Sequence, residues 1–125
     1  MKLLLDTHVF VWWDSDPARL SPAALAALTN PANEVVLSTA SVWEIVIKAA
    51  LGKLQLRLPL DQIVRQQQSN GLAVLPVLLD HVLAVDALPP VHKDPFGRLL
   101  VAQAKLESAA FVSADQQLAA YLPLL

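Results

Sequence analysis

The chain has 125 residues, a formal net charge of −2, 55% hydrophobic residues and no cysteine. This length predicts a single domain spanning residues 1–125. The small charge excludes the overall basic field that most duplex-binding proteins carry, and the missing cysteine excludes disulfides and thiolate metal sites.

The apolar segments are all short. The run after Met1 stops at Asp6, which is too early for a signal peptide, and Pro, Asn, Glu or Lys interrupts every candidate for a membrane span. We therefore expect a cytoplasmic protein that does not contact membranes, in keeping with the absence of cysteine.

Short apolar runs alternate with segments of helical period along the whole chain. In chain order they predict a strand at Lys2–Leu5, helices at Thr7–Asp14 and from Ser21-Pro22 to about Asn30-Pro31, a strand at Glu34–Ser38, helices from Ser41 to Gly52 and over Pro59–Asn70, a strand at Leu72–Leu75, helices over Leu79–Leu88 and from Asp94 to about Ser108, a strand at Ala110–Ser113 and a helix at Asp115–Tyr121. This order predicts an α/β/α sandwich with a central parallel sheet of four or five strands.

Acidic residues follow three of the predicted strands. Asp6 comes directly after the first strand, Glu44 lies just beyond the second, and Asp115 follows the last. Each has an ordinary interpretation as a helix cap, with Ser41 and Glu44 forming a capping box. Together they predict a shared site, because the C-terminal ends of parallel strands meet at one edge of the sheet. Asp94 is expected close by.

Clustered carboxylates repel one another. Two unit charges about 5 Å apart cost about 3 kcal/mol at an effective dielectric constant near 20. The cluster therefore needs either raised pKa values or a divalent cation. An all-oxygen ligand set of Asp6, Glu44 and Asp115 favours Mg²⁺ or Mn²⁺, because zinc prefers histidine and cysteine.

The sequence resembles a known family, the PIN domains, and among them the VapC-type toxin ribonucleases of bacterial toxin–antitoxin pairs. The resemblance covers nearly the whole chain and rests on Leu4-Leu5-Asp6-Thr7-His8, Ser41-Val42-Trp43-Glu44-Ile45 with Lys48 and Leu51-Gly52-Lys53-Leu54, the segment from His92 to Ala104, and Ser113-Ala114-Asp115. It implies a PIN-like fold and a Mg²⁺- or Mn²⁺-dependent endoribonuclease that acts on RNA. It also implies inhibition by a small VapB-type antitoxin that docks over the acidic pocket.

The sequence departs from the family pattern at the third acid. The family usually has Asp-Pro-Phe-Asp-Arg, in which the second aspartate carries the metal-site role, whereas this chain has Gly97 there. Asp94 lies one turn earlier and is either a substitute ligand or the helix N-cap. We expect impaired activity. The sequence leaves open whether Gly97 is natural or an inactivating change.

Other residues are predicted to support the site. Thr7, Ser41 and Ser113 stand beside the three acids, where they either cap helices or orient carboxylates. Arg98 is the foremost candidate for a phosphate contact or an ion pair with the acids. The further candidates for lining an RNA path are Lys48, Lys53, Arg57 and Lys93, with an ordinary solvated face as the alternative.

The remaining candidates have structural interpretations. His8, His81 and His92 form no catalytic triad by spacing and are expected to be structural or surface residues. Trp12 and Trp13 cannot both face the core of one short helix, so one is expected at an antitoxin or homodimer interface.

Three function classes follow. The first is a ribonuclease, and the second is a catalytically inert protein of the same fold that binds antitoxin and dimerises. The third, a phosphoacceptor receiver domain, lacks support because no acidic pair adjoins the first strand and no suitably placed lysine follows a late strand.

Overall fold

The computed structural model describes residues 1–125. Its elements are β1 (Lys2–Leu5), α1 (Thr7–Ser15), η1 (Pro17–Arg19), α2 (Pro22–Thr29), β2 (Glu34–Ser38), α3 (Thr39–Ala50), α4 (Leu60–Ser69), β3 (Ala73–Leu75), α5 (Leu79–Asp86), α6 (Pro95–Leu106), β4 (Ala110–Val112) and η2 (Gln116–Ala120), where η marks a 3-10 helix. None of its helices is both long enough and apolar enough to cross a membrane.

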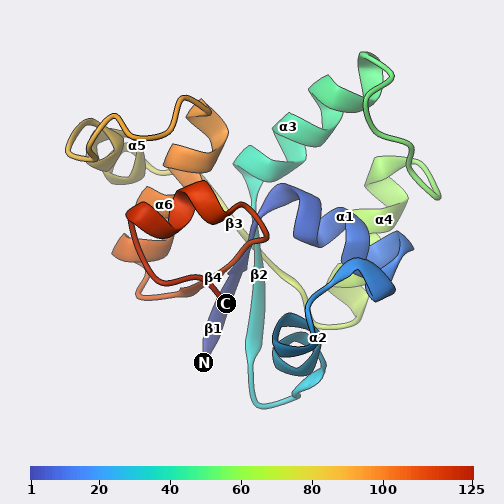
Figure 1. The fold of residues 1–125 in the computed structure, drawn as a ribbon. Coiled ribbons are helices and arrows are strands. Elements are labelled where there is room, and N and C mark those ends of the chain that lie inside the picture. The colour runs from blue at the N-terminus through green and yellow to red at the C-terminus, as the bar shows by residue number, and fades with distance from the viewer.

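The four strands form one parallel sheet in the order β3-β2-β1-β4 (Figure 1). The predicted α/β fold with a central parallel sheet is confirmed. Beyond β4, Leu124 forms a parallel bridge with Phe111, so residues near the C-terminus extend this edge of the sheet. Because β1 lies inside the sheet, Asp6 emerges between β2 and β4.

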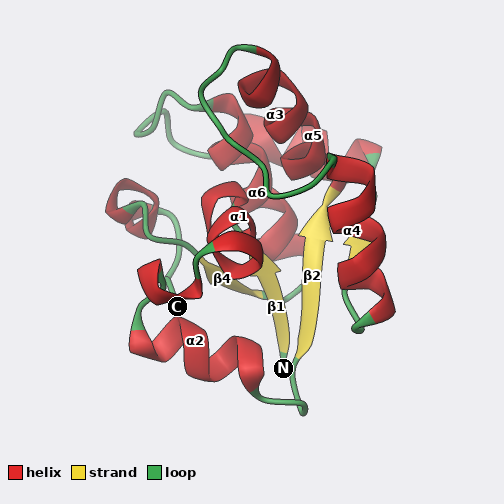
Figure 2. Ribbon diagram, turned by 90° about the vertical axis from the view of Figure 1, so that its right-hand side faces the viewer, coloured by secondary structure: helices red, strands yellow, loops and turns green.

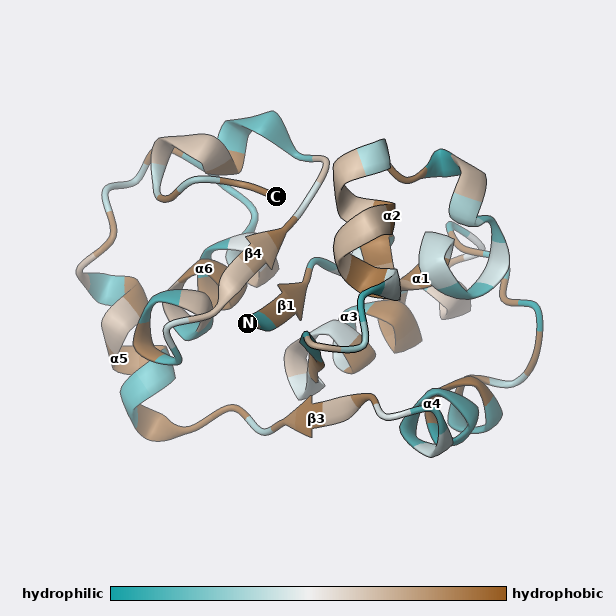
Figure 3. Ribbon diagram, turned by 90° about the horizontal axis from the view of Figure 1, so that it is seen from below, coloured by the Kyte–Doolittle hydropathy of each residue, from teal (hydrophilic) through white to brown (hydrophobic).

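Side chains of β1 alternate between two hydrophobic clusters. Leu3 and Leu5 enter a cluster built with α1, α2, α3 and α4, whereas Leu4 enters one built with α6 and η2. Helices therefore cover both faces of the sheet, as Figures 1 and 2 show. In the hydropathy view β1, β3 and β4 are mostly in brown shades, while α4 is largely teal (Figure 3). This pattern is that of a buried parallel sheet with amphipathic outer helices.

The helix after β2 begins earlier than predicted. α3 starts at Thr39, and its N-cap is Ser38, whose hydroxyl accepts the Ala40 N–H at 3.0 Å. Ser41 lies inside the helix and is buried, so the predicted capping box of Ser41 with Glu44 is wrong. The strand runs into the helix without a loop, so the last residue of the strand, Ser38, serves as the N-cap.

The end of the chain also differs from the prediction. Residues after Asp115 form the 3-10 helix η2 and not an α-helix. Glycines end α3 and α4 as predicted, since Gly52 (φ +73°) and Gly71 (φ +102°) adopt left-handed conformations that disfavour other residues.

Candidate functional site

Asp6 links the end of β1 to the start of α1. Its Oδ1 accepts the Thr7 N–H at 2.8 Å, which caps the helix, and its Oδ2 accepts the Ser113 hydroxyl at 2.6 Å. Ser113 follows β4, the neighbouring strand. The carboxylate is thus fixed from two adjacent strands.

Glu44 is buried on α3 and faces the same region. Its Oε1 accepts the Thr7 hydroxyl at 2.6 Å, and its Oε2 pairs with the Lys48 ammonium at 2.6 Å, one helical turn along. The hydroxyl of Ser41, also buried, lies 3.1 Å from that of Thr7. The packing of β1 beside β2 brings Thr7 to α3 and places these groups together.

Asp115 caps η2 and contacts a histidine. Its Oδ1 accepts the Gln117 N–H at 3.1 Å, and its Oδ2 lies 2.9 Å from His92 Nε2. His92 Nδ1 accepts the Asp94 N–H, which leaves Nε2 as the protonated nitrogen that donates to Asp115. Sequence reasoning assigned His92 only a structural or surface role, because no spacing signal relates it to Asp115.

Two hydroxyl residues connect the three acids. Thr7 joins Glu44 to Asp6, and Ser113 joins Asp6 to Asp115, whose N–H it accepts at 3.0 Å. Asp6 and Asp115 also line one cavity of about 290 Å³, with His8, Trp12 and Ala114. Glu44 is not part of its lining. The C-terminal edge of the sheet therefore carries a two-carboxylate pocket with a third carboxylate behind Thr7.

The pKa of Asp6 is raised. Burial is the largest cause, and the negative charge of Glu44 adds to it, whereas the hydrogen bonds from Ser113 and Thr7 act in the opposite direction. An acid whose pKa is higher in the folded state stabilises the fold most at low pH and loses that contribution as the pH rises through its folded value.

We therefore expect Asp6→Asn to gain thermal stability relative to the parent protein as the pH rises from about 4 to neutrality. Both proteins would be melted in EDTA, and the difference between their melting temperatures plotted against pH. Asp61→Asn, at an exposed position of α4, is the matched control. A difference that stays constant with pH would contradict the raised pKa.

The residues fit a hard cation in chemical type. All the acidic ligands offer oxygen, and Mg²⁺ commonly binds through one or two carboxylates plus waters and substrate phosphate. Asp6 and Asp115 in one cavity match that mode of binding. No group of three or more histidine, aspartate or glutamate side chains is spaced to hold a metal ion by itself. The two carboxylates therefore suit a cation that takes its remaining ligands from water and from substrate phosphate.

Asp94 and Gly97 lie at the start of α6. Asp94 is the N-cap, because its Oδ1 accepts the Phe96 N–H at 3.0 Å. Gly97 is buried, and a Cβ added there would lie 3.3 Å from Asp94 Oδ2 and 3.4 Å from Leu118 Cδ2. Position 97 therefore faces the η2 segment that Asp115 begins.

The predicted cations differ in their surroundings. Arg98 turns away from the acids and donates to the carbonyls of Val85 and Leu88, at 3.3 and 3.2 Å. The predicted role of Arg98 in an acid ion pair is wrong, because the end of α5 packs against α6 and takes up the guanidinium. Lys48 pairs with Glu44, and Lys93 is exposed.

Three other predictions concern the tryptophans, Arg57 and His81. Neither Trp12 nor Trp13 is exposed, because both pack half-buried against the larger hydrophobic cluster; the exposed tryptophan is Trp43. Arg57 ion-pairs with Asp14 at 2.9 Å, so the structure already gives this predicted cation an acidic partner. His81 is structural as predicted, since it is buried and contacts Glu107 at 3.2 Å.

Comparison with known proteins agrees with this architecture. The PIN domain family model matches residues 3–121. The ribonuclease VapC22 of Mycobacterium tuberculosis is 31% identical over 120 residues, which cover 93% of this chain and 88% of that protein.

Solved structures share the fold. VapBC2 from Rickettsia felis, bound to a DNA fragment from its promoter, superposes with a TM-score of 0.69 at 14% identity, covering all of this chain and 96% of that one. A toxin–antitoxin complex from Klebsiella pneumoniae gives 0.61 at 15% identity, with 97% and 92% covered. FitAcB from Neisseria gonorrhoeae gives 0.60 at 18%, with 95% and 91% covered. With the family model and the 31% relative agreeing over nearly its full length, the chain belongs to the PIN-domain family.

Proposed function

We propose that this chain is the toxin of a type II toxin–antitoxin pair, a Mg²⁺- or Mn²⁺-dependent endoribonuclease whose activity is lowered by Gly97. The observation that carries the proposal is the pocket in which Asp6 and Asp115 meet, joined by Ser113. The similarity to a ribonuclease over most of the chain supports it.

In this proposal Asp6 and Asp115 would hold the cation, and Glu44 would add negative charge from behind Thr7. Such a cation supplies an activated water and stabilises charge that develops on the phosphate. Ser113 and Thr7 fix the orientation of Asp6, and His92 fixes that of Asp115 by donating from Nε2. Preorganised carboxylates avoid reorganisation during the reaction.

Cleavage of RNA by the purified protein tests the proposal. We expect endonucleolytic products with Mg²⁺ or Mn²⁺ and none in EDTA, with Asp6→Asn as the blank. Because Asn keeps the shape but not the charge of the side chain, a contaminating host nuclease would show itself as equal activity in both preparations. Equal activity would contradict the proposal.

The alternative is a catalytically inert PIN-fold protein that binds antitoxin. Gly97 favours this alternative, because it offers no ligand. So do the contacts of Glu44 with Lys48 and of Asp115 with His92, which engage oxygens that a cation would need. A VapB-type antitoxin is the partner we propose in either case, because the neighbouring structures include toxin–antitoxin complexes. We also propose a cytoplasmic location.

We further propose that the chain forms a homodimer. Large apolar side chains are exposed on α3 and α5, namely Trp43, Val46, Leu79, Val82 and Leu83. Such surface usually meets a partner. Light scattering at micromolar concentration is expected to give about twice 13.5 kDa, and Trp43→Ser is expected to lower that mass. A monomer mass for the parent protein would contradict the dimer.

A further inference from the structure

A second cavity adjoins the acidic pocket. It has a volume of about 460 Å³, within the usual range of about 300–1,000 Å³ for small-ligand sites. It shares Trp12 and Ala114 with the acidic pocket, and Ser113, which binds Asp6, lies in its wall. A ligand that extends from the acids along this surface would enter the second cavity.

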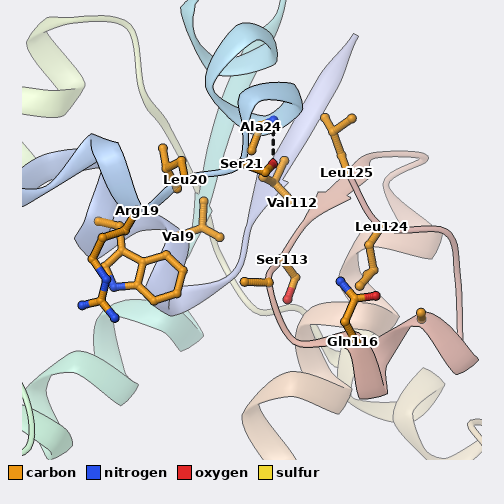
Figure 4. Close-up of a pocket in the computed structure, with 13 residues that line it drawn as sticks. Val9, Arg19, Leu20, Ser21, Ala24, Val112, Ser113, Gln116, Leu124 and Leu125 are labelled. Carbon is orange, nitrogen blue, oxygen red and sulfur yellow. Dashed lines mark hydrogen bonds between the residues drawn. The ribbon is translucent and has the colours of Figure 1, made fainter.

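The two sides of this cavity differ in chemistry. Figure 4 shows Arg19, Leu20 and Val9 on one side and Ser113, Gln116 and Leu124 on the other. Most of the lining residues are hydrophobic, while Arg19 and Gln116 are exposed polar residues of the lining. This combination suits a flat ring with polar edges better than it suits either a lipid or a simple ion.

Arg19 supplies an uncommitted positive charge at the rim. Its guanidinium carbon lies 4.6 Å from the centroid of the Trp12 ring, and the side chain forms no ion pair. The residue is exposed. An arginine stacked on an aromatic ring presents a planar surface for a base and a cation for the adjoining phosphate.

We propose that this cavity is a nucleobase subsite that holds the nucleotide next to the scissile phosphate in single-stranded RNA. The inference rests on the proposed ribonuclease function and adds to it the residues that select substrate. In it, the base lies against the hydrophobic lining beside Trp12, and Arg19 contacts the neighbouring phosphate.

The geometry also predicts which form of RNA and which base the cavity selects. A base must leave its helical stack to enter a cavity, so duplex RNA is excluded. Gln116 stands at the rim with an amide that both donates and accepts hydrogen bonds, so it is placed to read a base edge. Trp12 and Arg19 contribute affinity, while Gln116 contributes base preference.

Binding without cleavage tests the inference. The probes are fluorescein-labelled 12-mers of oligo(U) and oligo(A) and the duplex formed from them, measured by anisotropy in EDTA. We expect the parent protein to prefer single strands. Arg19→Gln and Ala119→Phe, which fills the cavity from an exposed wall position, are expected to weaken single-strand binding about 10-fold, within the range of one stacked base.

Matched controls separate a subsite from general charge or misfolding. Arg65→Gln removes the same charge from an exposed position of α4, where the guanidinium donates a hydrogen bond to Gln68, and is expected to leave binding unchanged. Gln116→Leu is expected to alter the ratio of the oligo(U) and oligo(A) dissociation constants. Thermal melts verify that each variant is folded, and KM in the cleavage assay gives a second measure of the same loss.

The outcomes are distinct. If the parent protein cleaves RNA, and both Arg19→Gln and Ala119→Phe match it in single-strand binding and KM, the nucleobase subsite is wrong. The proposed ribonuclease function would then still stand. Parent protein that neither binds nor cleaves RNA overturns the subsite and the proposed function together. Variants that retain RNA binding but fail to capture purified antitoxin would show that the cavity receives a protein segment instead.

Discussion

Gly97→Asp is expected to raise divalent-cation-dependent RNA cleavage on the order of 100-fold over the parent protein. The new carboxylate would stand on the face of α6 that packs against η2, the segment that Asp115 begins. A missing ligand lets the cation and its water shift, and misplacement by about 1 Å can cost on the order of 100-fold in rate. The rate of cleavage of a defined RNA, with Mg²⁺ in excess, measures the effect.

The surroundings of position 97 leave room for a new Cβ after a small local adjustment. A Cβ there is close to Asp94 Oδ2 at 3.3 Å, so the Asp94 carboxylate must shift by a few tenths of an ångström. An acid at the third residue of a helix also interacts favourably with the helix dipole, worth about 0.3–1 kcal/mol. Gly97→Ala introduces the same Cβ without the charge and is the matched control.

The comparison has several informative results. Activity that rises equally in Gly97→Ala and Gly97→Asp would assign the effect to helix rigidity and not to a ligand. Equal activity in the parent protein and Gly97→Asp would show that the parent site is already complete. No activity in any form, with Asp6→Asn in the Gly97→Asp background as the blank, would favour the inert antitoxin-binding protein.

Mn²⁺ is expected to stabilise the parent protein against heat. A ligand at tenfold its dissociation constant adds about 1.4 kcal/mol, which is a rise of about 5 °C in melting temperature for a domain of this size. The cation relieves the repulsion between Asp6 and Glu44 that contributes to the raised pKa of Asp6. Differential scanning fluorimetry over a Mn²⁺ titration measures the shift.

Asp6→Asn is expected to abolish this Mn²⁺ shift, while Asp61→Asn on exposed α4 should retain it. An undiminished shift in Asp6→Asn would place the bound cation elsewhere. Combining Asp6→Asn with Gly97→Asp shows whether a carboxylate at position 97 restores binding on its own. These measurements need no RNA, so they test the cation site separately from cleavage.

The strands were predictable because their signals are local. Apolar runs bounded by turn residues gave Lys2–Leu5 and Glu34–Ser38 with the bounds that the structure has. The rule that parallel strands carry sites at their C-terminal ends then indicated Asp6 and Asp115 as neighbours. The strand order, with β1 between β2 and β4, is a property of the whole sheet and has no such local signal.

The side-chain contacts that the sequence predicted wrongly or missed involve partners far away in the sequence. Ser41 has the spacing of a capping box with Glu44, but Glu44 is held by Thr7, which only the folded sheet brings near. Arg98 follows Gly97 in the motif, yet its guanidinium is taken by carbonyls near the end of α5. His92 has no meaningful spacing to Asp115 until β4 and α6 are in place.

The hydrogen bond from Ser113 to Asp6 has a consequence for the order of synthesis. It joins residues 107 positions apart, across the pairing of β4 with β1. While the ribosome has made only β1, β2 and β3, Asp6 lacks Ser113 and the pocket lacks Asp115. The acidic site therefore forms only when the last strand docks, so the proposed nuclease activity would be confined to chains that have completed the sheet.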